Sequence, residues 1–196
     1  MKIKRFFQHR VNSISHLKKI DQFDGCEIDL RSNGQQLYLH HDPYKIGCNF
    51  EDWLNEYNNA GIILNVKEEG LEPKIISILN QRNIDDYFFL DQSIPFLHKT
   101  GLNVTKKIAV RFSEFEPLNY CKLFSGFCEW VWIDSFNGSY FAESQIKELK
   151  KCFKLCLMSP ELRGFSKDII SELKTRYFGI DFDAVCTKDR LIWQKV

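Results

Sequence analysis

The chain has 196 residues, which at roughly 150 residues per domain predicts one domain covering residues 1–196. Hydrophobic residues make up 44% of it and charged residues 27%, a composition that excludes a wholly disordered protein. The formal net charge is +1, so the chain carries no broad field that would attract nucleic acid or an anionic membrane. No apolar run approaches the roughly 18 residues of a membrane span. We therefore expect neither nucleic acid nor stable membrane insertion among its interactions.

The N-terminus and the cysteines both indicate a cytoplasmic protein. The first residues lack the apolar stretch of a secretion signal. Seven cysteines are present, an odd number, and no Cys-x-x-Cys pair occurs. We therefore expect buried free thiols in a reducing compartment rather than disulfides or a cysteine-ligated metal.

Eight short apolar segments recur along the chain, each bounded by polar residues or glycine. Most are rich in β-branched or aromatic residues, which is typical of buried strands. These segments cover residues 4–9, 26–31, 61–67, 87–91, 107–113, 130–136, 154–160 and 183–189. A further strand over 35–42 follows Asn33-Gly34, and we expect it to pair with the second strand as a hairpin.

Between the strands lie stretches whose apolar residues recur every three or four positions, as on one face of a helix. We expect helices over residues 13–23, 50–57, 72–83, 144–153 and 166–178. Alternation of strand and helix predicts a parallel sheet, and eight such units favour an α/β fold, a compact (β/α)8 TIM-type barrel. These barrels usually need roughly 250 residues, so we expect a reduced eighth helix after Asp189. An open doubly wound sheet is the alternative.

In both folds, ligands bind at the carboxyl ends of the strands. Glu27 and Asp29 are alternate residues of the second strand, so their side chains share one face. Two carboxylates on one face repel each other, and burying them requires a cationic partner. That partner is either a basic side chain, in a salt-bridged cluster, or a divalent metal held by oxygen ligands.

The order of three short motifs resembles the amino-terminal signature of the glycerophosphodiester phosphodiesterase family, one of the phosphatidylinositol-phospholipase-C-like phosphodiesterase barrels. The motifs are His9-Arg10 followed by Asn12-Ser13, then Glu27-Ile28-Asp29-Leu30, then His41-Asp42-Pro43. They are specific over residues 9–43, and the resemblance continues weakly towards the end of the chain. It implies a phosphoric diester hydrolase of lipid metabolism that acts on a small-molecule phosphodiester.

The resemblance also implies roles for individual residues. It makes His9 and His41 the catalytic acid and base, and Arg10 and Lys67 the phosphate-binding residues. It gives a divalent metal, Mg²⁺ or Ca²⁺, the ligands Glu27, Asp29 and Asn65. Polar or aromatic residues near later strand ends are the candidate substrate contacts: Arg111, Trp132, Asp134, Glu161 and, beside them, Arg163.

Two features depart from the family pattern. Asn65 stands where the family has a glutamate, so the site loses one negative charge and its affinity for a metal should fall. The segment between Asp42 and Lys67 is shorter than the family's usual insertion, which predicts a more open site. The substrate is thus expected to be a glycerophosphodiester or a related sugar or polyol phosphodiester. Three alternatives stay open: a non-catalytic barrel that binds a phosphodiester or sugar phosphate, a sphingomyelinase D-like phospholipase, and a plain α/β domain.

Overall fold

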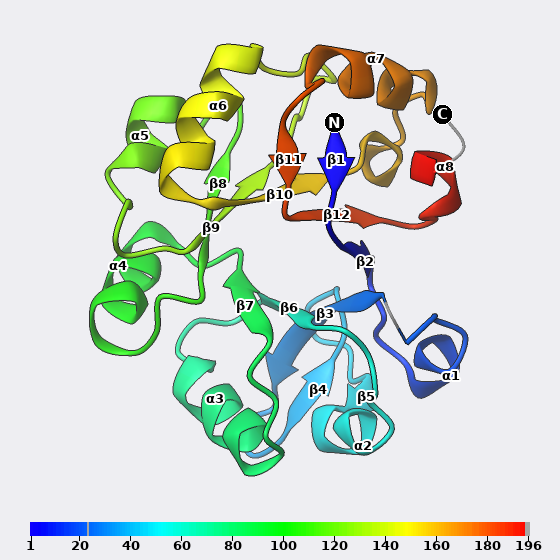
Figure 1. Ribbon diagram of the computed structural model, residues 1–196. Helices are drawn as coiled ribbons and strands as arrows, with labels where there is room; N and C mark the ends of the chain where they lie inside the picture. The colour runs from blue at the N-terminus through cyan, green and yellow to red at the C-terminus, as the bar shows by residue number, and fades with distance from the viewer. Residues whose placement is uncertain (23, 195–196) are drawn as a thin grey trace. The chain divides into compact units, whose positions relative to one another are not determined.

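The computed structural model describes residues 1–22 and 24–194. Strands and helices alternate along the chain, which divides into two compact units. We call Phe7–Ile108 the N-terminal unit, and Met1–Phe6 with the residues from Ala109 onward the C-terminal unit. Each unit has its own strands and its own helices (Figure 1).

The sheet of the N-terminal unit is built around β3. Its strands are β2 (Phe6–Gln8), β3 (Gly25–Ser32), β4 (Leu37–Leu39), β5 (Cys48–Asn49), β6 (Ile62–Val66) and β7 (Tyr87–Leu90). β3 runs parallel to β2 and β6, and β6 runs parallel to β7. Gly34 adopts a φ of 90°, which glycine tolerates, and the chain reverses so that β4 pairs antiparallel with β3. The predicted hairpin is confirmed.

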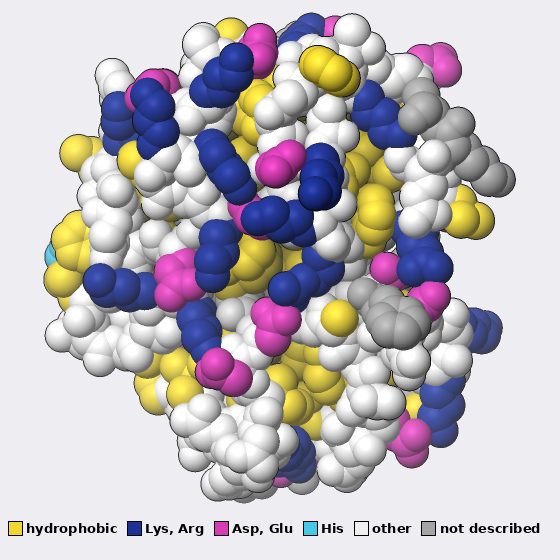
Figure 2. Space-filling model, in the orientation of Figure 1, with side chains coloured by type: hydrophobic (Ala, Val, Ile, Leu, Met, Phe, Trp, Pro, Cys, Tyr) yellow, Lys and Arg dark blue, Asp and Glu magenta, His cyan; other side chains and the backbone are white. Residues whose placement is uncertain are grey.

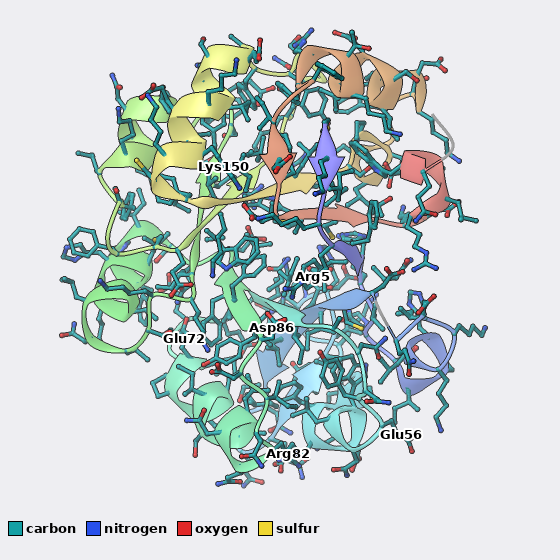
Figure 3. The ribbon with its side chains drawn as sticks, viewed as in Figure 1. Arg5, Glu56, Glu72, Arg82, Asp86 and Lys150 are labelled. Carbon is teal, nitrogen blue, oxygen red and sulfur yellow. The ribbon has the colours of Figure 1, made fainter. Side chains whose placement is uncertain are left out.

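Helices of the N-terminal unit cover strands that are buried on both faces, as parallel strands usually are. They are α1 (Ile14–Leu17), α2 (Phe50–Asn55), α3 (Glu72–Gln81) and α4 (Ile94–Asn103). The side chain of Asn49 caps α2 by accepting hydrogen bonds from the first backbone N–H groups of that helix. Arg82, labelled in Figure 3 at the end of α3, reaches Glu51 of α2 with 3.2 Å between Nη2 and Oε2.

In the C-terminal unit, β8, β9, β10 and β12 pair in that order, all parallel, and β1 pairs parallel with β11. The strands are β1 (Lys2–Ile3), β8 (Ala109–Phe112), β9 (Trp130–Ile133), β10 (Lys154–Met158), β11 (Asp181–Phe182) and β12 (Ala184–Thr187). The helices are α5 (Leu118–Lys122), α6 (Glu143–Cys152), the 3₁₀ helix η1 (Pro160–Arg163), α7 (Asp168–Arg176) and α8 (Leu191–Gln194). The short α8 is the reduced eighth helix that the sequence predicts.

Each of the eight predicted strand segments contains a strand of the structure, and four of the predicted helices are present as α2, α3, α6 and α7. The helix expected over 13–23 is shorter, because α1 ends at Leu17. The N–H groups of Lys19 and Ile20 donate to carbonyl oxygens three residues back, as in a 3₁₀ helix, instead of four. Residue 23 of that range lies outside the described residues. None of the helices within residues 1–22 and 24–194 is long and apolar enough to cross a membrane.

The sequence pattern does not predict α4 and α5. α4 contains Pro95, Thr100 and Gly101, all weak helix formers, and α5 spans only 5 residues. Figure 2 shows basic side chains interspersed with acidic ones on the face in view, in keeping with the net charge of +1.

Asp183 joins three segments of the C-terminal unit. Its carboxylate lies 2.7 Å from Nζ of Lys4 and 2.5 Å from Nζ of Lys150, the α6 residue labelled in Figure 3. The backbone N–H of Leu155 on β10 donates to the same group at 2.9 Å. Burial alone would raise the pKa of Asp183, but the hydrogen bonds from Lys150, Lys4 and Leu155 outweigh it and hold the pKa below 3.8.

We predict that Asp183→Asn lowers the free energy of unfolding by about 1–3 kcal/mol at neutral pH, because three donors lose a charged partner. A carboxyl group with a depressed pKa in the folded state stabilises the protein above its unfolded pKa, and this stabilisation is lost as the pH falls. The difference between wild type and variant in urea unfolding should therefore shrink below about pH 4. Asp181→Asn, at an exposed position nearby, is the control, and an equal loss at neutral and acidic pH would contradict the prediction.

Candidate active site

A cluster of polar side chains gathers at the carboxyl ends of β2, β3 and β6 in the N-terminal unit. Glu27 and Asp29 lie on β3 and are buried, and His9 follows β2 directly. Asn65 on β6 stands beside Asp29 in the parallel register. The strand pairing thus brings together residues that are far apart in the sequence, as predicted.

Glu27 is hydrogen-bonded on both carboxylate oxygens. The backbone N–H of Arg10 donates to Oε2 at 2.7 Å, and Nδ2 of Asn65 donates to Oε1 at 3.0 Å. Nε2 of His9 lies 3.9 Å from Oε2. Burial, and after it the neighbouring charge of Asp29, raises the pKa of Glu27 to about 7. Its charge state therefore depends on the cations around it.

Asp29 has basic partners and an amide partner. Nζ of Lys67 lies 3.3 Å from Oδ1, and Nε of Arg10 lies 4.0 Å from Oδ2. Asn12 binds Asp29 twice: Nδ2 donates to Oδ2 at 2.7 Å, and Oδ1 accepts the backbone N–H of Asp29 at 2.9 Å. The salt-bridged arrangement that the sequence left open is thus present around Asp29.

Two residues at this cluster adopt left-handed backbone conformations that non-glycine residues rarely occupy. Arg10 has a φ of 54° and Asp91, directly after β7, has a φ of 66°. The carboxylate of Asp91 lies 3.4 Å from Nζ of Lys67. Such conformations cost on the order of 1–3 kcal/mol each and persist where the surroundings hold them, often at functional sites.

The side chains around Glu27 supply oxygen ligands, the kind that Mg²⁺ and Ca²⁺ prefer. Among residues 1–22 and 24–194, no group of three His, Cys, Asp or Glu side chains is arranged to hold a metal ion. Asn65 adds an amide oxygen, however, and its buried Oδ1 accepts no hydrogen bond within the described residues. Two carboxylates and an amide oxygen are donor types that suit a hard divalent cation, with one negative charge fewer than the family pattern has. In the structure Nδ2 of Asn65, rather than Oδ1, is directed at Glu27.

His41 lies at the rim of the cluster rather than inside it. Its side chain is 41% exposed, its Nδ1 lies 3.0 Å from Oδ1 of Asp42, and its carbonyl oxygen accepts from Arg31. The backbone N–H of His40 donates to the carbonyl oxygen of Asp29 at 3.1 Å, which ties the histidine segment to β3. The ring of His40 accepts the N–H of Asp42 and so closes the turn.

The predicted substrate contacts lie in the C-terminal unit. Arg111 on β8 donates to the buried carboxylate of Asp134 after β9. Glu161 in η1 accepts from the hydroxyl of Thr187 at 2.6 Å, and Trp132 is buried within β9. The structure therefore gathers the predicted site residues into two groups, each within its own unit.

Sequence reasoning missed Asn12 and Asp91 as members of the cluster. Asn12 stands two positions after Arg10, inside the recognised motif, so its position was a usable signal. Asp91 ends an apolar strand as a single acidic residue, and only its left-handed backbone turns it towards Lys67. No sequence pattern predicts the left-handed backbone of Asp91.

No protein-family model matches the chain, and no curated protein matches it. Solved structures match it over nearly its full length. A glycerophosphodiester phosphodiesterase from Agrobacterium tumefaciens has a TM-score of 0.69 at 12% identity, covering 98% of each chain. An Oleispira antarctica phosphodiesterase, solved with the product sn-glycerol-3-phosphate, has a TM-score of 0.68 at 16% identity, covering 98% of this chain and 96% of that one. A third, from Parabacteroides distasonis, has a TM-score of 0.64 at 11% identity, covering 98% and 95%.

These likenesses show the fold of the chain. It is the α/β fold of the glycerophosphodiester phosphodiesterase barrels, with parallel strands alternating with helices and a reduced eighth helix. The fold predicted from the sequence is confirmed, and the resemblance to that family extends from a local motif to the whole chain.

We predict that Asn12→Ala lowers the free energy of unfolding by about 1–3 kcal/mol, because it removes both hydrogen bonds that hold the buried Asp29. Urea unfolding of the purified variant measures this loss. Asn58→Ala, at an exposed position, is the matched control and should change the stability little. Equal stabilities of the two variants would show that Asn12 does not hold Asp29.

Proposed function

We propose that the chain is a metal-assisted phosphodiesterase that hydrolyses a glycerophosphodiester or a related sugar or polyol phosphodiester. The observation that carries this proposal is the position of His9, 3.9 Å from a buried carboxylate that shares its strand face with Asp29. The fold shared with glycerophosphodiester phosphodiesterases supports it, and one relative binds sn-glycerol-3-phosphate as its product. A phosphate ester of that kind is the product expected here.

Arg10 and Lys67 are proposed to bind the phosphate. The side chain of Arg10 is 47% exposed, so its guanidinium is free to turn towards a substrate oxygen. Lys67 is held between Asp29 and Asp91, which fixes a positive charge at the strand ends. A divalent cation held by Glu27, Asp29 and Asn65 would neutralise charge on a non-bridging phosphate oxygen when bound.

His9 and His41 are proposed to divide the proton transfers. One takes a proton from the attacking water or substrate hydroxyl as its oxygen bonds to phosphorus. The other gives a proton to the leaving alkoxide as the second phosphorus–oxygen bond breaks. The carboxylate of Glu27 lies near His9 and stabilises the imidazolium form of that ring whenever it carries the proton.

We expect purified protein to hydrolyse at least one member of a panel of glycerophosphodiesters, with activity that depends on added Mg²⁺, Ca²⁺ or Mn²⁺. The panel contains glycerophosphocholine, glycerophosphoethanolamine, glycerophosphoglycerol and bis-p-nitrophenyl phosphate. His9→Ala should lower the rate by on the order of 10²–10⁴, since a proton-transfer group is lost. His98→Ala on α4, an exposed histidine, should leave the rate unchanged.

Other outcomes of that assay would favour one of the alternative functions. Metal-dependent stabilisation of the fold without turnover would favour a non-catalytic phosphodiester-binding barrel, for which Asn65 in the ligand set is the supporting observation. Turnover of sphingomyelin in place of the panel would favour a sphingomyelinase D-like phospholipase. Turnover that survives His9→Ala would contradict the proposed chemistry.

We predict that Asn65→Asp destabilises the protein in the absence of divalent metal and strengthens its binding of Mg²⁺. It replaces the donor to Glu27 with a third buried carboxylate, so in excess chelator the variant should lose about 1–3 kcal/mol of stability. With Mg²⁺ the added charge should raise the metal affinity by on the order of tenfold. Thermal unfolding in chelator and in Mg²⁺ measures both effects, with exposed Asn58→Asp as the control. A response to Mg²⁺ identical to that of wild type would place the metal elsewhere.

A further inference from the structure

One arginine side chain holds the backbone of His41, at the rim of the candidate active site. Arg31 lies on β3, two positions after Asp29, so its side chain leaves the same face of the strand. Its Nη2 donates to the carbonyl oxygen of His41 at 3.0 Å, and its Nε donates to the same oxygen at 3.3 Å. One edge of the guanidinium group therefore binds one peptide group of the histidine segment.

The guanidinium group of Arg31 is itself anchored by an acid. Its Nη1 lies 3.5 Å from Oε1 of Glu68, two positions after β6, and β6 runs parallel to β3. Oε2 of Glu68 accepts the backbone N–H of Ser32 at 3.0 Å, so the acid is tied to β3 as well. The side chain of Arg31 is only 12% exposed. Glu68 compensates the charge of Arg31, while the shorter contacts of the guanidinium go to the carbonyl oxygen of His41.

Arg31 acts at the point where the chain leaves the sheet. The antiparallel strands β3 and β4 lie side by side (Figure 1), and their pairing reaches His40, whose N–H donates to a carbonyl oxygen of β3 at 3.1 Å. Further along the loop the side chain of Tyr44 is fully exposed. The contact from Arg31 thus extends the hold of β3 by one residue, from His40 to His41.

The ring of His41 is oriented by its neighbour in the sequence. Nδ1 of His41 lies 3.0 Å from Oδ1 of Asp42, and Nζ of Lys45 lies 3.2 Å from Oδ2 of the same carboxylate. The hydrogen bond with His41, and after it the contacts with Lys45, lower the pKa of Asp42 to about 2. An ionised carboxylate only accepts hydrogen bonds, so Nδ1 of His41 carries the hydrogen. The ring then takes up and releases a proton at Nε2.

The contact from Arg31 and the contact with Asp42 are linked through one peptide group. His41 and Asp42 are adjacent, so the planar peptide between them sets the angle at which their side chains meet. The oxygen of that peptide is the atom that Arg31 binds. Rotation of the peptide would carry Nδ1 of His41 away from the carboxylate, and the guanidinium group resists this rotation.

We propose that Arg31 is a positioning residue for His41, because it fixes the peptide group on which the tautomer and the orientation of the histidine ring depend. This inference rests on the proposed function of His41 and adds to it a residue that touches neither the substrate nor a metal. A displacement of about 1 Å can lower the rate of an enzyme on the order of 10²-fold, so the loss of one anchor is measurable in turnover.

The test is steady-state hydrolysis by the full-length protein of the phosphodiester on which it is most active. Arg31→Gln should lower kcat about 10- to 100-fold and leave KM within twofold of wild type, since a proton-transfer group is displaced while substrate binding is untouched. Arg31→Lys keeps the charge without the fork of donors and should stay within tenfold of the wild-type kcat. Arg82→Gln, which removes the partner of Glu51 in the same unit, is the matched control and should leave kcat unchanged.

A second variant and a second measurement keep the test independent of folding and of turnover. Glu68→Gln retains Arg31 but removes the charge that anchors it, and should lower kcat about threefold. Nitrogen NMR of the His41 ring, assigned from the signal that is missing in His41→Gln, reports which ring nitrogen carries the hydrogen. Wild type and Arg31→Lys should show the hydrogen on Nδ1, and Arg31→Gln should shift it towards Nε2.

The outcomes separate this inference from the proposed function. Hydrolysis by the wild-type protein with the same kcat and the same His41 tautomer in Arg31→Gln would overturn the inference and leave the proposed function standing. A raised KM at unchanged kcat would also overturn it, because Arg31 would then bind the substrate. A wild-type protein that hydrolyses no phosphodiester contradicts the proposed function, and the tautomer alone then decides whether Arg31 positions His41: a shift in Arg31→Gln supports this role, and identical spectra contradict it.

Discussion

Burial of two like charges on one strand is the constraint on which the candidate active site depends. Glu27 and Asp29 share one face of β3, and neither reaches solvent. Their mutual repulsion is offset by cations and amide donors that arrive from the segment after β2 and from β6. Arg10 has a left-handed backbone conformation, and its N–H donates to Glu27. The backbone strain at Arg10 thus accompanies a hydrogen bond to a buried carboxylate. The same need for compensation explains why two arginines converge on Asp134 in the C-terminal unit.

The sequence predicts the strands well because buried parallel strands are short, apolar and β-branched, and these properties are local. It predicts the cluster around Glu27 because alternate residues of a strand share a face and parallel strand ends meet. It does not predict α4, whose proline and glycine are weak helix formers and whose helix depends on packing. Nor does it predict the contact between Asp91 and Lys67, because a left-handed φ at a single residue leaves no composition signal.

The comparisons with solved structures concern the fold of the chain. Solved structures with TM-scores of 0.64 to 0.69 share only 11% to 16% of residues with this chain. The same fold is therefore reached by widely different sequences, as expected where apolar volume and strand–helix alternation are kept. The sequence resemblance to the glycerophosphodiester phosphodiesterase family is specific only over a short run of polar residues between His9 and Asp42. Asn65 lies outside this run and departs from the family pattern that the sequence resembles.

The pairing of β1 with β11 has a consequence for synthesis on the ribosome. Lys2 and Ile3 stand beside Asp181 and Phe182, and Lys4 is paired with Asp183. Within Phe7–Ile108, β3, β4, β5, β6 and β7 pair with strands of the same unit, so this part can become compact once those residues have emerged. Translation proceeds at roughly 5–20 residues per second, so Lys2 and Ile3 are made about 10–40 seconds before the strand with which they pair. β1 thus reaches its native pairing only after residues 181–182 have been made.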